Sequence, residues 1–265
     1  MPTQTLSIKY SKNEGLLFSP SELLEKYFWG IPTCTQSGGE LPKNIIKENI
    51  QAAQVSVETW LSVLFCPQIL TEKKDFIKRE YEGVWGFIMA TYPINAAYKL
   101  TGSINQSQQI QMPKEWLSVR NTSDGKTFSR NVYIVPGGNG GNIAQSNSFT
   151  GVSPNLGWFG SSTVPNYWEL KYKTGFDDFS KVMDIVDYVG KYASIPIFAM
   201  LGEVLLGVGI SSQSLSFDGL SQSVSTLKSN QGGLFGTRIN MYLTDLLQNF
   251  ARIDKQYRGI IFNVF

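Results

Sequence analysis

The sequence predicts an α+β fold: four helices packed around or beside a small antiparallel β element, with a long Gly/Asn/Ser-rich loop and an extended C-terminal strand. Three observations predict it. The chain has 265 residues and is 42% hydrophobic, which is enough to bury a core. Apolar residues recur every three or four positions in four stretches. Short apolar and aromatic runs lie between the second and third stretch, and the 25 glycines are typical of strands and ordered loops.

The first two helices are predicted near the N-terminus. The first covers residues 19–29, where Ser19 precedes a proline in the first turn, as is typical of a helix start. The second covers residues 43–65 and begins after Pro42. Its apolar positions step by three and four, which predicts one face packed on a core. These positions are Ile46, Ile50, Ala53, Val57, Leu61 and Leu64.

A β-rich part, residues 68–176, follows the second helix. Its short apolar or aromatic runs favour strands. The predicted strands are residues 68–76, 84–89, 94–100, 110–112, 131–135 and 167–176. In the last of them, strand alternation places Trp168, Leu170 and Tyr172 on the buried side and the lysines between them on the other.

A long loop, residues 136–166, interrupts the β-rich part. It is dominated by Gly, Asn and Ser, and it lacks both the GK[ST] ending and the GxGxxG spacing of phosphate-binding loops. Loops of this length inside a compact domain usually serve as a functional surface or as part of an interface. We therefore expect part of the function to lie in this loop, as a functional surface or as an interface element.

The third helix is predicted over residues 177–206, with Pro196 kinking or dividing it. Asp177 and Asp178 stand at its expected start, where carboxylates stabilise exposed backbone N–H groups. The apolar stretch 193–210 is interrupted by Glu203, Pro196 and glycines. It therefore favours a buried helix over a membrane span.

The C-terminal extension, residues 207–265, begins with a serine-rich segment. A fourth helix is predicted over residues 237–257. The chain then ends in a short apolar strand that is free to add to the sheet of a neighbouring protein. The residues predicted to form this partner interface are Ile260, Ile261, Phe262, Val264 and Phe265.

Composition excludes several classes of function. The chain has no histidine, which removes Ser-His-Asp and Cys-His catalysis and histidine-ligated metal sites. Cys34 and Cys66 cannot close a tetrahedral metal site alone, and we expect two isolated, buried or half-buried thiols with no assignable disulfide. The net charge of +2 gives no strong attraction to nucleic acid or to an anionic membrane. No catalytic, metal-binding or cofactor-binding residue is predicted.

Two other functions stay open on the residues alone. A carboxylate-dependent glycan hydrolase would use Asp177, Asp178 or Glu203. A carbohydrate-binding surface module would use the tryptophans and the Gly/Asn loops. The N-terminus has no secretory pattern, so we expect synthesis in the cytoplasm.

Several stretches occur in a distinctive order: IIKENIQAAQVSVETWL, YPI, PKEWL, YIVP, and then YWELKYKTGFD running into a long helix. Over roughly residues 19–206, this order resembles the head-to-tail connector (adaptor or neck ring) proteins of tailed bacteriophages. The resemblance lies in the arrangement more than in any single motif. It implies that the second helix packs beside the third, with the β element between them in sequence.

The resemblance also implies a function. Such connectors are non-enzymatic virion proteins that form a ring, commonly of twelve copies, at the head-tail junction. The ring lies beneath the portal protein, tail or neck proteins attach below it, and DNA passes through its lumen without sequence-specific contacts. The expectation is therefore one connector domain over residues 1–265, located in the virion neck, with no membrane contact. The long loop and the C-terminal extension depart from the short members of the family.

Overall fold

The computed structural model describes residues 15–34, 39–77, 87–105, 108–121, 128–135, 163–206, 212–217, 220–225 and 233–258. The fold is α+β, as predicted. The chain divides between two compact units. The helical unit contains the described residues of Ser11–Leu61 and Val182–Asp254, and the β-rich unit contains those of Ser62–Lys181 and the C-terminal stretch from Lys255.

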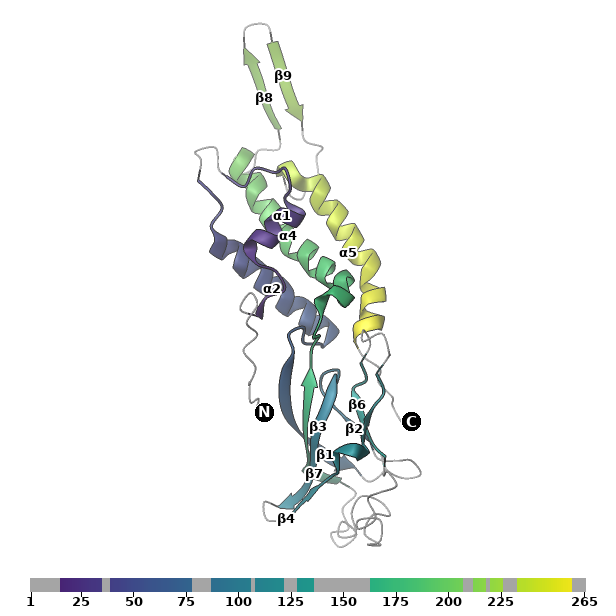
Figure 1. The fold of residues 1–265 in the computed structure, drawn as a ribbon. Coiled ribbons are helices and arrows are strands. Elements are labelled where there is room, and N and C mark those ends of the chain that lie inside the picture. Colours follow the sequence, from purple (N-terminus) through teal and green to yellow (C-terminus); the bar gives the residue numbers. More distant parts are fainter. Residues whose placement is uncertain are drawn as a thin grey trace. The chain divides into compact units, whose positions relative to one another are not determined.

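The helical unit contains four α-helices within the described residues. They are α1 (Pro20–Tyr27), α2 (Lys43–Leu61), α4 (Met183–Leu206) and α5 (Gly236–Tyr257), the last of which ends in the β-rich unit. Of these, α2 and α4 make the most extensive contact. In Figure 1, α2 and α5 flank α4, and α1 packs against both α2 and α4. A 3-10 turn, η6 (Gly233–Phe235), and a hairpin of β8 (Ser212–Phe217) and β9 (Leu220–Ser225) precede α5. The sequence analysis does not predict this hairpin.

Local chemistry explains the first two helices. In α1, the Ser19 hydroxyl accepts the Glu22 N–H and the Glu22 carboxylate accepts the Ser19 N–H, which is a complete capping box. The predicted apolar face of α2 is buried from Ile46 to Leu61. The helix ends four residues before the predicted boundary, because Ser62 adopts a left-handed backbone conformation with φ 52°.

The predicted start of the third helix is wrong. A 3-10 turn, η5 (Phe179–Val182), comes first, and α4 begins only at Met183. The Asp178 carboxylate accepts the N–H and the hydroxyl of Ser180, which favours a tight turn here. Of the two effects predicted for Pro196, the division of the helix is wrong, and the kink stays a prediction. The helix runs through this proline, because the core contacts of Ile197 and Phe198 outweigh one lost backbone hydrogen bond.

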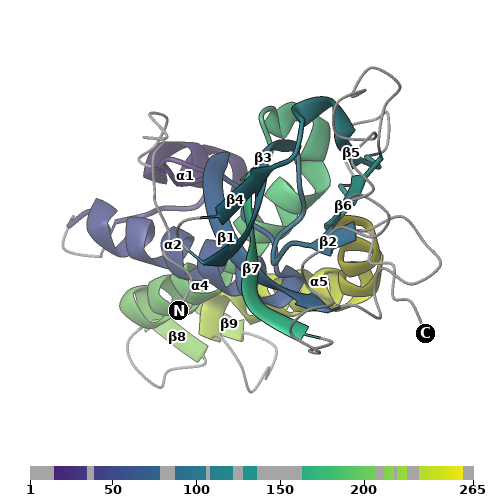
Figure 2. The same ribbon diagram turned by 90° about the horizontal axis from the view of Figure 1, so that it is seen from below.

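The β-rich unit has two antiparallel sheets. One has the strand order β1-β7-β3-β4 and the other β2-β6-β5 (Figure 2). Their bounds are β1 (Gln68–Ile77), β2 (Phe87–Met89), β3 (Ala96–Asn105), β4 (Gln108–Gln111), β5 (Leu117–Val119), β6 (Asn131–Ile134) and β7 (Thr163–Thr174). All but β5 match predicted strands, and β5 follows an unpredicted 3-10 turn, η3 (Lys114–Trp116).

The two sheets share one hydrophobic core. Trp168, Leu170 and Tyr172 on β7 are completely buried, which confirms the predicted alternation. Side chains from β2 and β6 of the second sheet, Ile88 and Val132 among them, belong to the same core. This shared core makes the β-rich unit one packed body.

The end of the predicted long loop is part of β7. This strand begins at Thr163, so residues 163–166 are not loop, and the rest of that loop lies outside the described residues. The register with β1 shifts between Lys74 and Phe76, so that Pro165 and Asn166 lie in a bulge of β7 opposite Asp75. A proline fits such a bulge because it has no ladder hydrogen bond to lose there.

The division into units bears on the predicted domains. The predicted β-rich part, residues 68–176, falls within the β-rich unit. Neither unit is one continuous stretch of chain, because within the described residues the backbone passes between them three times. The expectation of a single domain over residues 1–265 stays a prediction.

Candidate functional site

Two of the three carboxylates considered for glycan hydrolysis, Asp177 and Asp178, are engaged in local contacts. Asp177 accepts the Asn95 side-chain N–H at 2.9 Å and pairs with Lys173. Hydrogen bonds from Ser180 lower the pKa of Asp178, whereas a general acid at a glycosidase site needs a raised pKa. Glu203 is exposed on α4 of the helical unit.

The two cysteines are both free. Cys66 is half-buried, as expected, but Cys34 is exposed, which corrects the expectation of a buried or half-buried thiol. Cys34 forms an isolated β-bridge with Glu40 in a short surface segment that gives its side chain no cover. Within the described ranges, no group of three or more Cys, Asp or Glu side chains is placed to hold a metal ion.

A buried carboxylate in the β-rich unit escaped the sequence analysis. Glu72 is 6% exposed and accepts the Tyr172 hydroxyl at 2.5 Å. Its second oxygen accepts the N–H and the hydroxyl of Thr91 and pairs with Lys74 at 3.2 Å. Burial, then the charge and hydrogen bond of Glu72, raise the pKa of Tyr172. Both carboxylate oxygens are satisfied, so the cluster stabilises the sheet.

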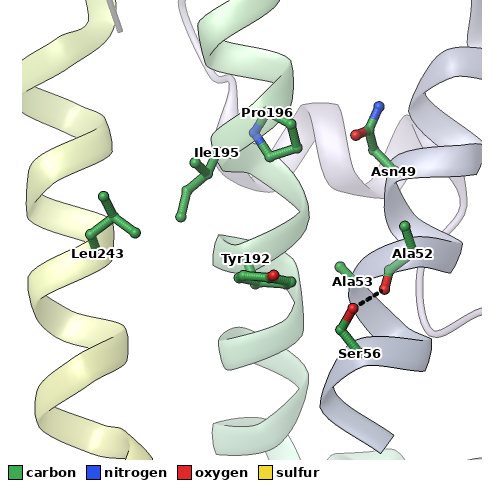
Figure 3. Close-up of a pocket in the computed structure, with 8 residues that line it drawn as sticks. All are labelled: Asn49, Ala52, Ala53, Ser56, Tyr192, Ile195, Pro196 and Leu243. Carbon is green, nitrogen blue, oxygen red and sulfur yellow. Dashed lines mark hydrogen bonds between the residues drawn. The ribbon is translucent and has the colours of Figure 1, made fainter. Parts of the chain in front are cut away.

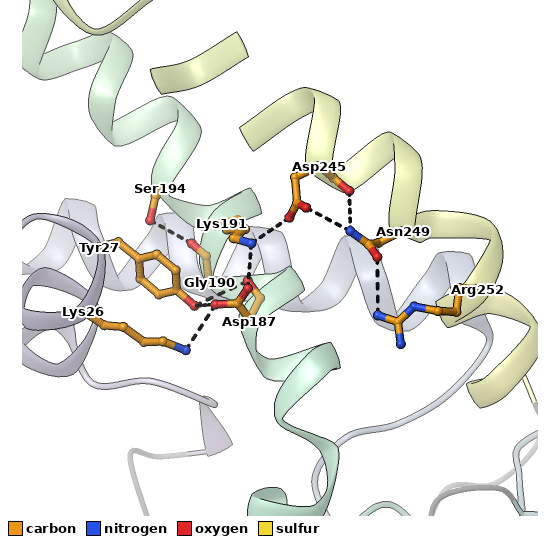
Figure 4. Close-up of polar contacts among 9 residues, drawn as sticks. All are labelled: Lys26, Tyr27, Asp187, Gly190, Lys191, Ser194, Asp245, Asn249 and Arg252. Carbon is orange, nitrogen blue, oxygen red and sulfur yellow. Dashed lines mark hydrogen bonds and ion pairs between the residues drawn. The ribbon is translucent and has the colours of Figure 1, made fainter. Parts of the chain in front are cut away.

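The helical unit contains a chain of polar contacts, here called the polar ladder, that links α1, α4 and α5 (Figure 4). The Tyr27 hydroxyl donates to Asp187 Oδ1 at 2.9 Å, and Lys26 Nζ lies 3.2 Å from the same oxygen. Lys191 Nζ lies 2.8 Å from Asp187 Oδ2 and 2.6 Å from Asp245 Oδ2. Lys191 thus bridges two helices with one charge.

The polar ladder continues along α5. The Asn249 side chain donates to the backbone and side-chain oxygens of Asp245, and Arg252 donates to the Asn249 side-chain oxygen at 3.4 Å. Arg252 also pairs with Asp184 on α4 at 3.6 Å. The ladder therefore fixes the register of α5 against α4.

The pKa shifts in the polar ladder follow from these contacts. Burial works to raise the pKa of Asp187, but hydrogen bonds from Lys191 and Tyr27 and the nearby charges outweigh it, so the pKa is lowered. Burial likewise works to lower the pKa of Lys191, and its two carboxylate partners raise it overall. Burial and the contact with Asp187 raise the pKa of Tyr27. The shifts keep Asp187 and Lys191 charged and the Tyr27 hydroxyl protonated, the states in which these groups make their contacts, so the ladder stabilises this arrangement.

A groove lies between α2 and α5, with α4 as its floor (Figure 3). Its volume is about 280 Å³. Residues from three helices line it without a single charged side chain. They are Asn49, Ala52, Ala53 and Ser56 of α2, Tyr192, Ile195 and Pro196 of α4, and Leu243 of α5. Small residues on α2 keep this space open, and the Ser56 hydroxyl is occupied by the Ala52 carbonyl at 2.8 Å.

Exposed apolar side chains accompany the groove and are here called the rim. Trp60 of α2 is 42% exposed and packs edge-on against Tyr192, with ring centroids 5.1 Å apart, and against Phe250 of α5. Phe250 is 39% exposed, and Leu247, one turn earlier, is 78% exposed. Aromatic enrichment and absence of charge are typical of the centre of a protein–protein interface. The groove and its rim are therefore the best-supported interaction site in the described part of the chain.

A second cavity, of about 360 Å³, lies near the start of α1 and is more polar. Gln54 forms part of its wall, but this side chain already bonds the Leu17 N–H and the Gly15 carbonyl. Its amide therefore anchors the segment before α1 to α2.

The predicted interface residues of the C-terminal tail, 260–265, lie outside the described residues, as do residues 136–162 of the long loop. The groove was missed by the sequence analysis. The sequence nevertheless contains a signal for the groove, which is a second, uncharged face on α2. This face is formed by Asn49, Ala52, Ser56 and Trp60. No helix within the described ranges is long and apolar enough to cross a membrane.

Comparisons of the chain with protein-family models and with curated proteins find no match. The functional argument therefore rests on the residues and on their arrangement.

Proposed function

We propose that this chain is a structural virion protein that forms a ring at the head-tail junction of a tailed bacteriophage. The ring joins the portal protein to tail or neck proteins, and the genome passes through its lumen. The subunit acts through surfaces that bind copies of itself and its neighbours, and it performs no chemistry.

One observation carries this proposal. α2 and α4 pack along one another, although the strands β1 to β7 lie between them in sequence. This is the helix pairing that the resemblance to phage connectors implies. The last of these strands, β7, runs through Gly175 and Phe176 into the turn before α4, in the order expected for that family.

The connection from β7 to α4 is closely specified. Gly175 has φ +91°, and a Cβ atom there would overlap the Cys66 carbonyl. The Phe176 N–H donates to the Phe65 carbonyl at 2.9 Å, which joins this connection to the segment that follows α2. The glycine in YWELKYKTGFD therefore has a structural reason to be there.

Two further features support a binding role over an enzymatic one. The uncharged groove with its aromatic rim has the composition of a protein interface. The net charge of +2 also suits a lumen through which DNA must slide, since a strongly basic channel would retain phosphates.

The proposal is tested by electron microscopy of the purified full-length chain, alone and mixed with the portal protein of the same phage. We expect closed rings, alone or on the portal, with about twelve subunits. A chain that stays monomeric under both conditions contradicts the proposal. Glycan binding or hydrolysis by the monomer would favour the alternative carbohydrate-directed functions.

The C-terminal tail offers a second test of assembly. Deletion of residues 259–265 removes the apolar residues predicted to add to a neighbour's sheet. We expect a folded protein with an unchanged far-UV circular dichroism spectrum and weaker ring or portal association. Unchanged association would exclude the tail as an interface.

A further inference from the structure

Trp29 is the most exposed large apolar side chain in the described part of the molecule, at 85%. An indole removes a large apolar area from water when it is buried. An exposed tryptophan can therefore contribute strongly to binding when a partner covers it. The backbone of Trp29 is well anchored. The preceding Phe28 is buried and stacks on Phe198 of α4, with ring centroids 4.2 Å apart. The Ile31 N–H also donates to the Phe28 carbonyl, which closes a turn around Trp29.

Trp29 and the groove lie on opposite sides of α4. Asp187, Gly190 and Phe198 of α4 face α1, which ends just before Trp29. Tyr192, Ile195 and Pro196 of the same helix line the groove. At 3.6 residues per turn, the mean directions of these two sets differ by roughly 150°.

The figures agree with this geometry. In Figure 1, α1 is drawn in front of α4, with α2 on the left and α5 on the right. In Figure 3 the order is reversed, with α5 on the left and α2 on the right, so the groove is seen from the side opposite α1. A projecting side chain and a recess on opposite faces of one subunit are what a head-to-tail interface between identical copies requires.

The groove also matches an indole in charge and in size. None of its lining residues carries a charge, so a phosphate or a charged peptide would lose hydration there without gaining a partner. Its volume of about 280 Å³ lies just below the ~300–1,000 Å³ of typical small-molecule sites. It therefore suits one large side chain, and the rim residues Trp60 and Phe250 can exclude water around it.

We propose that Trp29 of one subunit inserts into the uncharged groove of the next subunit and that this contact closes the ring. This inference rests on the proposed function, and its partner is a second copy of this chain. Repeated around an axis, such a heterologous contact generates a closed ring when the rotation per subunit divides a full turn.

The first experiment measures self-association of the full-length chain by mass photometry and electron microscopy. Trp29→Ala is expected to weaken association by at least about tenfold, as truncation of a central tryptophan does. Val55→Ala is the matched control, because Val55 is an exposed apolar residue of α2 outside the groove. Both variants should keep the wild-type far-UV circular dichroism spectrum, since both side chains are exposed.

The second experiment locates the contact. In a Cys34→Ser, Cys66→Ser background, an Ile31→Cys chain is mixed with a Ser56→Cys chain and treated with a short bismaleimide. The first chain carries its cysteine at Ile31, in the turn beside Trp29, so that the indole stays in place. We expect cross-linked dimers from this mixture and none when Ser56→Cys is replaced by Val55→Cys. Each chain alone should give no cross-linked dimer, because the contact is between different surfaces.

The outcomes separate this inference from the proposed function. Rings that still form in the Trp29→Ala variant, with no cross-link between positions 31 and 56, would overturn the inference and leave the proposed ring intact. A wild-type chain that forms no ring, alone or with the portal, would overturn both.

Discussion

At the scale of single residues, buried polar groups in this protein are matched by partners from distant segments. Asp187 is the clearest case, because its two oxygens serve Tyr27, Lys26 and Lys191. A half-buried carboxylate is tolerated only when its lost hydration is replaced in this way. Tyr27 and Asp187 are separated by 160 residues in sequence. Their pairing thus depends on the packing of α1 against α4.

Tyr27→Phe removes only the hydroxyl that donates to Asp187. We expect the free energy of unfolding to fall by about 1–2 kcal/mol, the usual loss for a hydrogen bond to a charged group. Tyr188→Phe is the control, because Tyr188 is similarly buried but no hydrogen bond of its hydroxyl is seen among the described residues. Urea denaturation of both variants measures the difference. Equal losses would contradict a specific role for the Tyr27 hydroxyl.

Asp187 should also contribute to acid sensitivity. Its folded pKa is below its ordinary value of 3.8, so its contribution to stability is present above pH 3.8 and is lost as pH falls through the folded pKa. We expect Asp187→Asn to be less stable than wild type at pH 7 and to lose less stability on acidification to about pH 3. The measurement is urea denaturation at several pH values.

A second carboxylate serves as the control for this pH dependence. Glu25 is an exposed residue on α1, and Glu25→Gln should follow the wild-type curve. If Asp187→Asn kept the full wild-type acid dependence, the polar ladder would not be its source.

At the scale of elements, close helix contacts in the helical unit depend on small residues. Gly190 lies inside α4, where alanine is normally the better helix former by about 1 kcal/mol. Here a Cβ atom would overlap the ring of Tyr27, which the bond to Asp187 holds in place. The groove has a similar origin, since Ala52, Ala53 and Ser56 leave space between α2 and α5.

Gly190→Ala is therefore expected to destabilise the protein by about 1–3 kcal/mol, the cost of overpacking, despite the gain in helix propensity. In a Tyr27→Ala background the same change should be neutral or stabilising, because the ring that it would meet is gone. Thermal or urea unfolding of the four proteins completes the double-mutant cycle. A stabilising effect in the wild-type background would show that α1 can move away at little cost.

At the scale of the whole molecule, the described part of the chain passes between the two units three times, after Leu61, Lys181 and Asp254. Within the β-rich unit, the segments beside these crossings are held together. Phe176 packs against Phe65 and Tyr257, with ring centroids 6.5 and 5.7 Å away. These three rings come from the segments beside all three crossings.

Arg130 also connects the segments beside these crossings, within the β-rich unit. It is 9% exposed, and its guanidinium donates to the carbonyls of Ser62, Thr91 and Arg258 at 2.7–3.2 Å. Ser62 follows α2, and Arg258 follows α5. The guanidinium donates from three different nitrogens, so it can span acceptors that lie too far apart for the single nitrogen of a lysine ammonium.

Arg130→Lys is expected to lower the free energy of unfolding by about 1–3 kcal/mol, because at least one part-buried carbonyl loses its donor. Arg120→Lys is the control, since Arg120 is exposed and packs over the Tyr133 ring at 4.8 Å. The control should cost less than about 1 kcal/mol. Chemical denaturation distinguishes them, and similar losses would refute the importance of the buried guanidinium.

Much of the fold was predictable because the relevant signals are local. The apolar faces of α2 and α4, the capping residues of α1 and the alternation along β7 each occupy one short stretch of sequence. Helix ends were predicted less well. α2 stops at Leu61 because Ser62 turns into a left-handed conformation, and α4 starts late because Asp178 favours a 3-10 turn. These are single-residue effects that periodicity does not register.

The sequence by itself determined the α+β class, the buried faces of the helices and strands, and the absence of histidine chemistry. Only the tertiary structure decided that Tyr27 reaches Asp187, that α2, α4 and α5 enclose an uncharged groove, and that Trp29 projects from the opposite face. The physical reason is the separation in sequence between the residues that determine each feature. Periodicity is set by neighbouring residues, whereas partners, recesses and exposed anchors depend on which distant segments pack together.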